Sequence, residues 1–309
     1  MSDAPQYVWF NGRVVPYDQG RIHVQSAAMK FGAAVYEGLR GYWNADAREL
    51  YVFRQDAHVQ RLCQSLKLMR MEAPFAPAQM REAVLEVLRA NNFREDVHIR
   101  QSAFLEGDSA MTSTGPVGMA VAAYPMGRIK NSEAGLHYTI SSWLRIPDSA
   151  MPPRLKCIAN YHNGRLAALQ ARADGYDGTF LLNSRGKISE TPGATMFLVR
   201  GGRPITPSIT SDILEGVTRD TLIRLLAEVH GLAVEERDVD RTEVYVADEV
   251  FVCGSAYEVT PVVSVDRYTV GDGRVGPLTK AILATYLDAA RGQVPARRDW
   301  LTPTYGNVQ

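Results

Sequence analysis

Apolar and polar residues alternate with two different periods along the first part of the chain. Tyr7-Val8-Trp9-Phe10 and Arg13-Val14-Val15 flank Asn11-Gly12, a dipeptide that tolerates the positive φ angles of a type I′ turn. This pattern predicts that the chain begins with an antiparallel hairpin. Two further strands are expected at 98–105 and 117–124.

Helical spacing of apolar residues separates these two groups of strands. One amphipathic helix is predicted over 56–71, with Asp56 placed to cap its start. Another is predicted from Pro77, in its first turn, to Asn91-Asn92. The first part of the chain therefore combines antiparallel strands with two helices.

The second half changes period more often. A helix is expected over 163–173, with Leu166 and Leu169 on one face, and another over 217–230, closed by Gly231. Further strands are expected at 136–143, 178–182, 195–199 and 248–253, and a last helix at 277–290. Strands and helices do not alternate regularly, which favours an α+β fold over a doubly wound sheet.

The length of 309 residues suits two domains. The segment 127–135 is polar and bounded by glycines, so it is interpreted as a linker between an N-terminal α+β domain, 1–126, and a C-terminal domain, 136–309. A loop at 106–116 is too long for a tight hairpin. It is either a mobile surface loop or a lid that completes a site, its own or a neighbour's.

Composition narrows the class of partner. Lys+Arg and Asp+Glu both count 34, without a charged block, so neither nucleic acid nor a membrane surface is expected as a partner. No apolar run approaches the roughly 18 residues of a spanning helix, and the start lacks signal-peptide features, so a cytoplasmic location is expected. Cys63, Cys157 and Cys253 lack metal-ligand spacing, which predicts free thiols and no metal site.

One lysine stands in an otherwise apolar run, Arg154-Leu155-Lys156-Cys157-Ile158-Ala159. The chain has only six lysines against 28 arginines, so this position is not a generic surface charge. A desolvated amine has a depressed pKa and can act as a nucleophile in Schiff-base chemistry. The same pattern also fits a lysine on an edge strand whose amine reaches solvent.

The start of the helix at 217 is a second candidate for chemistry. Gly216 precedes Val217 and Thr218, and a flexible glycine, a threonine able to cap and the unpaired amides of a helix N-terminus can cradle a phosphate. Gly254-Ser255-Ala256 could add amides for the same anion. Each pattern is equally consistent with an ordinary capped helix or a tight turn.

Several ordered stretches together resemble the class IV (fold type IV) aminotransferases, and most closely the bacterial branched-chain amino-acid aminotransferases. The resemblance covers nearly the full length and implies a two-domain α+β fold with a smaller N-terminal sandwich-like domain and a larger pseudo-barrel domain. The matching stretches are Val8-Trp9-Phe10-Asn11-Gly12, Val35-Tyr36-Glu37-Gly38-Leu39-Arg40, His58-Val59-Gln60-Arg61-Leu62, Lys156 with Asn160-Tyr161, Ile188-Ser189-Glu190, Gly216-Val217-Thr218-Arg219-Asp220, Ala247-Asp248-Glu249-Val250-Phe251 and Gly276-Pro277-Leu278-Thr279-Lys280.

The resemblance implies pyridoxal 5′-phosphate as cofactor, with Lys156 as the catalytic Schiff-base lysine that also moves a proton. It implies that Glu190 pairs with the pyridine nitrogen and keeps it protonated, and that Tyr161 hydrogen-bonds the phenolic oxygen. The implied phosphate ligands are Arg61, Gly216, Val217, Thr218 and Ser255. The substrate positions implied are Phe31, Tyr36, His98, Arg100, Met126, Ala256 and Tyr257.

Some positions depart from the family pattern. Thr195 replaces a usual asparagine, His98 and Phe31 replace tyrosines, and Met126 replaces a tryptophan. The loop at 107–113 lacks the family's usual glycine-rich form. Lost hydroxyls in a pocket change the preference for polar substrates, so these departures bear on substrate rather than on the chemistry.

The activity implied is ping-pong transamination between a hydrophobic, branched-chain-like L-amino acid and a 2-oxo acid such as 2-oxoglutarate. An (R)-amine or D-amino-acid transaminase, or an aminodeoxychorismate-type lyase, remains open on the same fold, and so does a cofactor-free binding protein. A homodimer or higher homo-oligomer is expected from the resemblance, with the 107–113 loop reaching toward the partner's site.

Overall fold

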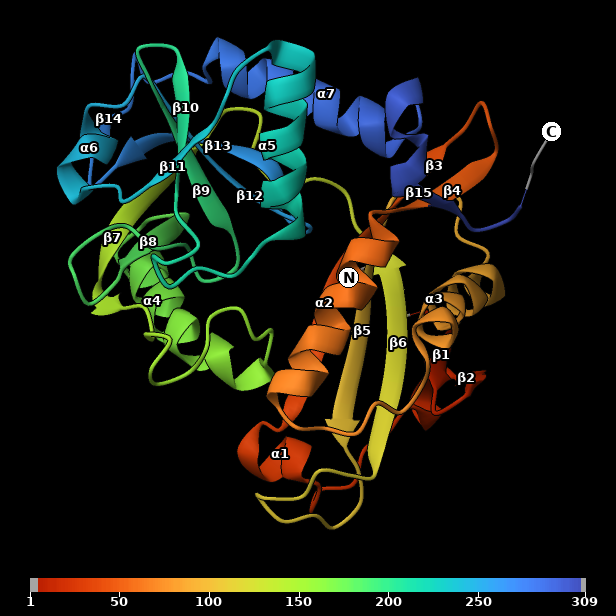
Figure 1. Ribbon diagram of the computed structural model, residues 1–309. Coiled ribbons are helices and arrows are strands. Elements are labelled where there is room, and N and C mark those ends of the chain that lie inside the picture. The colour runs from red at the N-terminus through yellow and green to blue at the C-terminus, as the bar shows by residue number, and fades with distance from the viewer. Residues whose placement is uncertain (1–4, 307–309) are drawn as a thin grey trace. The chain divides into compact units, whose positions relative to one another are not determined.

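The computed structural model describes residues 5–306. These residues form two compact units (Figure 1). Unit 1 contains residues 5–127, Leu155–Ala159 and 288–306, and unit 2 contains Arg128–Arg154 and Asn160–Leu287. The short segment with Lys156 thus belongs to unit 1, whereas the residues on either side of it belong to unit 2.

Unit 1 is built on one antiparallel sheet with the strand order β15-β4-β3-β5-β6-β1-β2. Its strands are β1 (Tyr7–Phe10), β2 (Arg13–Pro16), β3 (Ala34–Asn44), β4 (Glu49–Phe53), β5 (Val97–Leu105), β6 (Val117–Pro125) and β15 (Leu301–Pro303). Its other elements are η1 (Tyr17–Gln19), α1 (Ala27–Phe31), α2 (Gln55–Leu68), α3 (Pro77–Asn91) and η3 (Pro295–Trp300). The predicted hairpin is confirmed, since Asn11 and Gly12 both have positive φ between β1 and β2.

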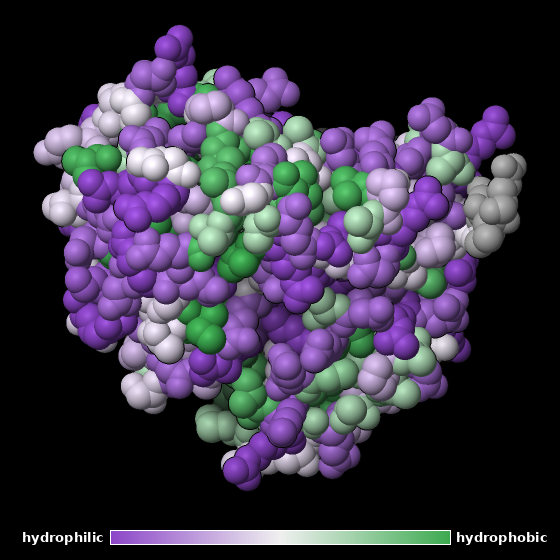
Figure 2. Space-filling view, turned by 45° about the horizontal axis from the view of Figure 1, so that its top comes forward, coloured by the Kyte–Doolittle hydropathy of each residue, from purple (hydrophilic) through white to green (hydrophobic). Residues whose placement is uncertain are grey.

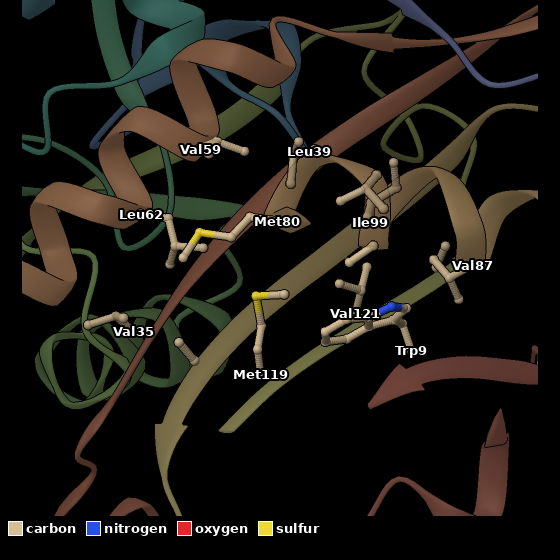
Figure 3. Close-up of a cluster of buried hydrophobic side chains, with 14 of the residues drawn as sticks. Trp9, Val35, Leu39, Val59, Leu62, Met80, Val87, Ile99, Met119 and Val121 are labelled. Carbon is tan, nitrogen blue, oxygen red and sulfur yellow. The ribbon is translucent and has the colours of Figure 1, made fainter. Parts of the chain in front are cut away.

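The core of unit 1 lies where α2 and α3 cover one face of the sheet (Figure 1). Side chains of both helices, such as Leu62 and Met80, meet strand residues such as Leu39, Ile99 and Val121 (Figure 3). All five are fully buried, and each such side chain contributes roughly 1.5–3 kcal/mol of transfer free energy. Along β6 the core residues Met119, Val121 and Ala123 occupy alternate positions, so the intervening residues occupy the opposite face of the sheet.

Unit 2 contains a mixed sheet with the order β11-β10-β9-β12-β13-β7-β8, and β14 pairs with β13. Its strands are β7 (Leu136–Leu144), β8 (Gly178–Leu182), β9 (Thr195–Arg200), β10 (Arg203–Pro207), β11 (Glu235–Arg237), β12 (Glu249–Gly254), β13 (Glu258–Val265) and β14 (Tyr268–Thr269). Its helical elements are α4 (Tyr161–Ala173), α5 (Val217–His230) and α6 (Arg241–Tyr245), and the short η2 (Ile158–Asn160) begins in unit 1 and ends at the first residue after it. Helix α7 (Pro277–Ala290) ends three residues into unit 1.

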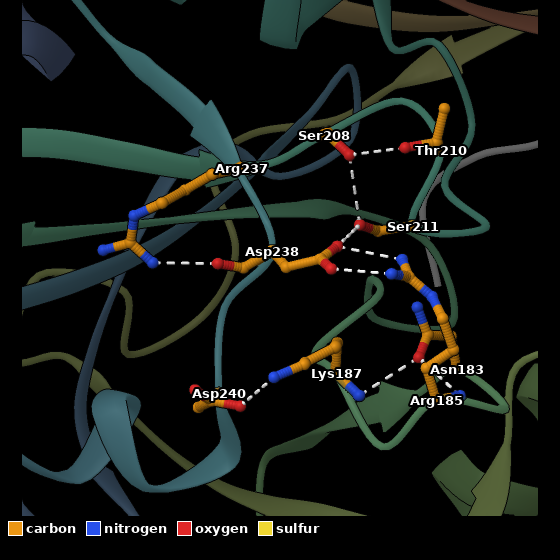
Figure 4. A network of polar contacts seen from close by, with 9 residues as sticks. All are labelled: Asn183, Arg185, Lys187, Ser208, Thr210, Ser211, Arg237, Asp238 and Asp240. Atoms are coloured by element: carbon orange, nitrogen blue, oxygen red, sulfur yellow. Dashed lines mark hydrogen bonds and ion pairs between the residues drawn. The ribbon is translucent and has the colours of Figure 1, made fainter.

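A polar network connects the loops that follow β8, β10 and β11 in unit 2 (Figure 4). The carboxylate of Asp238 accepts hydrogen bonds from both terminal nitrogens of Arg185, at 2.7 and 2.9 Å, and from the Ser211 hydroxyl at 3.1 Å. Lys187 forms an ion pair with Asp240. The four charged side chains are between 32% and 64% exposed, so the network orders loops more than it stabilises the core.

The predicted α+β fold is confirmed, and so are the helices at 77–91, 217–230 and 277–290. Asp56 was expected to cap α2, but the N-cap residue is Arg54 and no side chain caps the helix. Asp56 instead lies in the first turn, where a carboxylate favours the positive end of the helix dipole. The pattern missed the short elements α1, α6, β11, β14 and β15, and also β3, β4, β10 and β13. The last four are buried at nearly every position, polar residues included, so no alternation of apolar and polar residues marks them.

The expectation for α4 was also wrong about its buried face. Leu166 and Leu169 are 47% and 49% exposed, while Gly164, Ala167 and Ala171 face the unit. Small residues allow the helix to approach its neighbours closely, and a Cβ on Gly164 would lie only 3.0 Å from Pro192. The close approach of α4 to its neighbours therefore determines which face of the helix is buried, and the larger Leu166 and Leu169 lie on the exposed face.

Within residues 5–306, no helix is both long and apolar enough to cross a membrane.

Candidate active site

The segment that carries Lys156 extends the edge of β3. Strand β4 pairs only with the end of β3, from Gly41 onward, so the backbone at the start of β3 lacks that neighbour. Cys157 forms an isolated antiparallel bridge with Val35, and the N–H of Tyr36 donates to the carbonyl of Lys156 at 3.0 Å. The backbone of Lys156 is thereby fixed to the sheet.

The side chain of Lys156 is half-buried, and its Nζ lies 4.7 Å from the centroid of the Tyr36 ring. The N–H of Lys156 donates to the hydroxyl of Ser65 on α2, at 3.3 Å. Strand and helix together hold this lysine, so its amine is presented by rigid elements rather than by a free loop.

One face of α2 brings two side chains to a buried carboxylate on β3. Arg61 donates to both oxygens of Glu37, from Nε at 2.8 Å and from a terminal nitrogen at 2.6 Å, and His58 Nδ1 lies 2.7 Å from the same carboxylate. His58 and Arg61 are one helical turn apart, and therefore share a face. The bidentate contact uses two of the five N–H donors of a guanidinium.

The pKa values of both Glu37 and His58 are lowered in this cluster, so Glu37 is ionised and His58 is neutral. Burial by itself would raise the pKa of Glu37, but the charge of Arg61 and the hydrogen bonds from Arg61 and His58 outweigh it and lower the pKa to about 2. Burial lowers the pKa of His58 and outweighs the hydrogen bond and the charge of Glu37, which raise it; the positive charges of Arg61 and Lys156 add to the lowering. Glu37 therefore serves as the permanent counter-charge of Arg61.

The opposite face of the same sheet carries three predicted substrate residues. Register places Tyr36 across from Ser102, and Gly38 across from Arg100, so Tyr36, His98 and Arg100 point to one side of the strands. The guanidinium of Arg100 stacks on the Tyr36 ring at 3.8 Å from its centroid. Tyr36 thus contacts both Arg100 and Lys156.

His98 is a neutral imidazole in this cationic surrounding. Burial, together with the positive charges of Arg40, Arg100 and Lys156, lowers the pKa of His98 to about 4. Its Nδ1 is buried and has no hydrogen-bond partner among residues 5–306, and a Cβ on Gly38 would lie 3.2 Å from its Nε2. A glycine at position 38 therefore gives the imidazole its room.

Phe31 and Met126 lie at the margins of unit 1. Phe31 ends α1 and is 44% exposed. Met126 follows β6, and its carbonyl accepts a hydrogen bond from Arg40 at 2.8 Å. The structure thus anchors the backbone of Met126 but leaves Phe31 on the surface of the chain.

Unit 2 holds the predicted glutamate in a fixed orientation. Glu190 is buried, and each of its carboxylate oxygens has a donor: Arg145 Nε at 3.0 Å and the N–H of Leu214 at 3.1 Å. Its main chain pairs with Leu181 of β8 through the Leu181 N–H at 2.8 Å. Glu190 is therefore fixed both at its backbone and at its carboxylate.

The start of α4 docks beside this glutamate. Asn163 donates to the carbonyl of Leu144, the residue before Arg145, at 2.8 Å, and Gly164 packs against Pro192, two residues after Glu190. Tyr161, the first residue of α4, therefore belongs to the same part of unit 2 as Glu190.

Two further segments converge on the loop after Glu190. Gly216, the N-cap of α5, packs beside the hydroxyl of Thr195: a Cβ there would lie 3.4 Å from Oγ1. A Cβ on Gly254, before the hairpin turn of Ser255, Ala256 and Tyr257, would lie 3.3 Å from the carbonyl of Gly193. The N–H groups of Val217 and Thr218 in the first turn of α5 have no place in the intrahelical ladder.

Thr218 was expected to cap α5, but it is the second residue of the helix. The N-cap residue is Gly216, and no side chain makes a capping hydrogen bond there. A glycine N-cap leaves the first amides without a side-chain acceptor, which suits an anion from outside the helix.

Sequence reasoning assigned no role to four residues that support these side chains: Glu37, His58, Ser65 and Arg145. Glu37 and His58 lie inside the matching stretches 35–40 and 58–62, so the resemblance had already drawn attention to them. Ser65 and Arg145 follow no local pattern, and only the fold places them next to Lys156 and Glu190.

Comparison with known proteins places the chain in a family. A model of the family described as Amino-transferase class IV matches residues 34–265, which include Lys156 and Glu190. The chain therefore belongs to the class IV aminotransferases.

Its relatives carry one description. A probable branched-chain-amino-acid aminotransferase of Aquifex aeolicus is 37% identical over 98% of both chains, and the branched-chain-amino-acid aminotransferase of Escherichia coli K12 is 37% identical over 96% of both. Among solved structures, the branched-chain amino acid aminotransferase of Thermobaculum terrenum in its PLP-form is 41% identical, with a TM-score of 0.91 over 98% of this chain and 99% of that one. The branched-chain aminotransferase of Thermoproteus uzoniensis, with norvaline, is 36% identical, with a TM-score of 0.93 over 97% of this chain and the whole of that one.

Proposed function

We propose that this chain is a pyridoxal-phosphate-dependent branched-chain amino-acid aminotransferase, which exchanges the amino group of a hydrophobic L-amino acid with a 2-oxo acid such as 2-oxoglutarate. The observation that carries the proposal is the placement of Lys156, whose backbone is fixed to β3 and α2 in a chain of this family. Relatives described in the PLP-form and with pyridoxamine 5′-phosphate support the cofactor.

The residues present fit this cofactor chemically. Bound pyridoxal phosphate supplies an electron sink that stabilises the charge left when a substrate loses its Cα proton. Lys156 offers an amine for covalent attachment and for moving that proton. The fixed carboxylate of Glu190 would hold a proton on the ring nitrogen, and the phenol of Tyr161 would donate to the ring oxygen.

The phosphate would be held by backbone amides, hydroxyl groups and one arginine. The first turn of α5 offers the amides of Val217 and Thr218 and the Thr218 hydroxyl, after Gly216, and the hairpin turn adds Ser255. Arg61 adds a permanent positive charge, and a guanidinium suits phosphate geometry. Glu37 and His58 hold Arg61 in one orientation for this role.

The substrate would be read by the residues on the open face of the unit 1 sheet. Arg100 would bind a carboxylate, Tyr36 would pack against the side chain, and Phe31, His98 and Met126 would shape the pocket. Ala256 and Tyr257 in the hairpin turn of unit 2 would contact the substrate as well. The exchange proceeds in two half-reactions, in which the amino group passes first from donor to enzyme and then to the acceptor.

We also propose a homodimer or a higher homo-oligomer. Apolar side chains reach the surface among polar ones (Figure 2), and Met29, Phe31 and Met111 are 67%, 44% and 69% exposed. The loop at 107–113 is tied to α1, because the Ala27 N–H donates to Ser109 Oγ at 2.8 Å and Lys30 pairs with Asp108 at 3.2 Å. This support suits a loop that is presented to a partner's site.

A cytoplasmic location is proposed from the cysteines. Among residues 5–306, Cys63, Cys157 and Cys253 form no disulfide, and cysteines outside disulfides are typical of reducing compartments.

The proposed activity is tested with purified protein, pyridoxal phosphate and a panel of amino donors. Wild-type protein should become yellow and form glutamate from L-leucine and 2-oxoglutarate. D-alanine and 1-phenylethylamine distinguish a D-amino-acid or (R)-amine transaminase, and release of pyruvate from aminodeoxychorismate would identify a lyase. Protein that stays colourless with added cofactor would refute the proposal.

A further inference from the structure

We propose that Arg145 is a positioning residue for the cofactor chemistry: it keeps Glu190 ionised and oriented, and it limits how tightly the enzyme holds the proton on the ring nitrogen. The inference rests on the proposed function, in which Glu190 faces that nitrogen. No local sequence pattern marks Arg145, which follows directly after β7.

The geometry fixes both partners of this pair. The Arg145 N–H donates to the carbonyl of Leu182 at 2.8 Å, and its side chain donates to Glu190 Oε1 at 3.0 Å. The Leu214 N–H donates to Oε2. Arg145 and Glu190 are 9% and 6% exposed, so water screens their interaction only weakly.

A buried carboxylate without a counter-charge favours its neutral form, because desolvation raises its pKa. A neutral Glu190 would carry a proton on its carboxyl group, and it would therefore present no negative charge to a ring nitrogen. The guanidinium of Arg145 supplies the missing counter-charge. Glu190 is therefore ionised before the cofactor binds.

The contact with Arg145 also weakens the attraction between Glu190 and the protonated ring nitrogen. With the cofactor bound, one carboxylate faces two positive groups, the guanidinium and the protonated ring nitrogen, and these two repel each other. The nitrogen then releases its proton at a lower pH than it would beside Glu190 alone. By this mechanism Arg145 adjusts the strength of the electron sink without contacting the substrate.

The pair can be tested by following the ring nitrogen itself. Wild type, Arg145→Met and Arg145→Lys are loaded with cofactor that carries ¹⁵N in the ring, and the ¹⁵N chemical shift is recorded against pH. Arg154→Met is the matched control, because Arg154 pairs with Asp148 and Glu215 in the same unit but is substantially exposed. In loaded Arg145→Met the protonated ring nitrogen becomes the counter-charge of Glu190 in place of the guanidinium. The nitrogen should therefore keep its proton to a pH higher by about 1–3 units, the usual effect of removing a neighbouring positive charge.

Arg145→Lys keeps the charge and should restore most of the wild-type profile, whereas Arg154→Met should match wild type. Coinciding profiles for wild type and Arg145→Met would overturn the proposal, and so would a nitrogen that stays protonated in both proteins across the range. If Arg145→Met does not fold, the comparison is made with Arg145→Lys against Arg145→Gln, where the same order of shifts is required.

A failure of this inference is distinct from a failure of the proposed function. Wild-type protein that binds no cofactor gives no ¹⁵N signal from a bound ring and refutes the proposed function itself. Wild type that binds cofactor normally, with a profile unaffected at Arg145, refutes only the role of Arg145.

Discussion

Each unit contains a buried pair of a glutamate and an arginine, and the two pairs differ in how the carboxylate is bound. In unit 1, Glu37 is completely buried, and both of its oxygens are held by the same guanidinium, with His58 as a further partner. In unit 2, Glu190 receives one bond from Arg145 and one from a backbone amide. The first carboxylate is saturated by its arginine, whereas the second is held at two separate points.

The difference indicates which member of each pair acts on the cofactor. Glu37 is the support of Arg61, because it fixes the guanidinium and supplies its counter-charge. Arg145 is the support of Glu190, because it keeps the carboxylate ionised and oriented. A buried ion pair is seldom strongly stabilising by itself, since desolvation offsets most of the attraction, so an orienting role accounts for both pairs better than stability does.

The largest effect is expected for Lys156→Ala, which removes the reactive amine itself. Turnover should fall by roughly 10⁴-fold or more, because both covalent attachment and proton transfer are lost. Absorbance of the bound cofactor and glutamate formation measure the two losses. Lys187→Ala, which breaks only the pair with Asp240, is the control, and turnover in Lys156→Ala close to the control would remove Lys156 from the catalytic role.

Glu190→Gln and Glu37→Gln should separate the two pairs by their kinetics. Glu190→Gln should lower kcat by roughly 10²–10³-fold, because a charge placed for the transition state is lost, and should leave phosphate binding largely intact. Glu37→Gln should mainly weaken cofactor binding, because Arg61 loses its support. Cofactor titration and steady-state kinetics on both variants are needed, and equal effects on kcat and on cofactor affinity in the two would abolish the distinction.

Glu37 should also govern acid stability. Its pKa is about 2 in the folded protein against 4.5 for an ordinary glutamate, so the folded state binds fewer protons than the unfolded chain between these values. Its contribution is fully present above about pH 4.5 and is lost as pH falls through about 2, with a size of roughly 3 kcal/mol from linkage. Denaturant unfolding of wild type and Glu37→Gln from pH 7 to 3 should show the two stabilities converging as pH falls, and a constant difference would contradict the assignment.

The smallest effect is expected at an exposed pair of the same chemistry. Arg185→Ala removes both hydrogen bonds to Asp238 in the network of unit 2 (Figure 4). Exposed ion pairs contribute roughly 0–1 kcal/mol, so thermal unfolding should shift only slightly and turnover should not change. A loss as large as that of Glu37→Gln would show that burial is not what separates these pairs.

The longer helices and the first hairpin could be predicted because their signals are local. The turn at Asn11-Gly12, the proline at position 77 and the glycine at position 231 each act on their own neighbours in the chain. The buried face of α4 could not be predicted in this way, because the close packing of Gly164 on Pro192 outweighed the apolar spacing of Leu166 and Leu169. Several strands were missed because contacts between segments far apart in the sequence, and not local patterns, determine their pairing.

The sequence by itself determined the family, the cofactor class and the identity of the reacting groups, because Lys156, Glu190 and the segment at 216–218 lie in ordered motifs whose residue types carry that chemistry. Only the tertiary structure decided what surrounds them. It placed Lys156 on the free edge of β3 beside Ser65 and Tyr36, and it joined Glu190 to Arg145, 45 residues away along the chain. Residue type fixes which proton or charge a group can carry, whereas burial and neighbouring charges, which exist only in the folded chain, fix the state in which it is held.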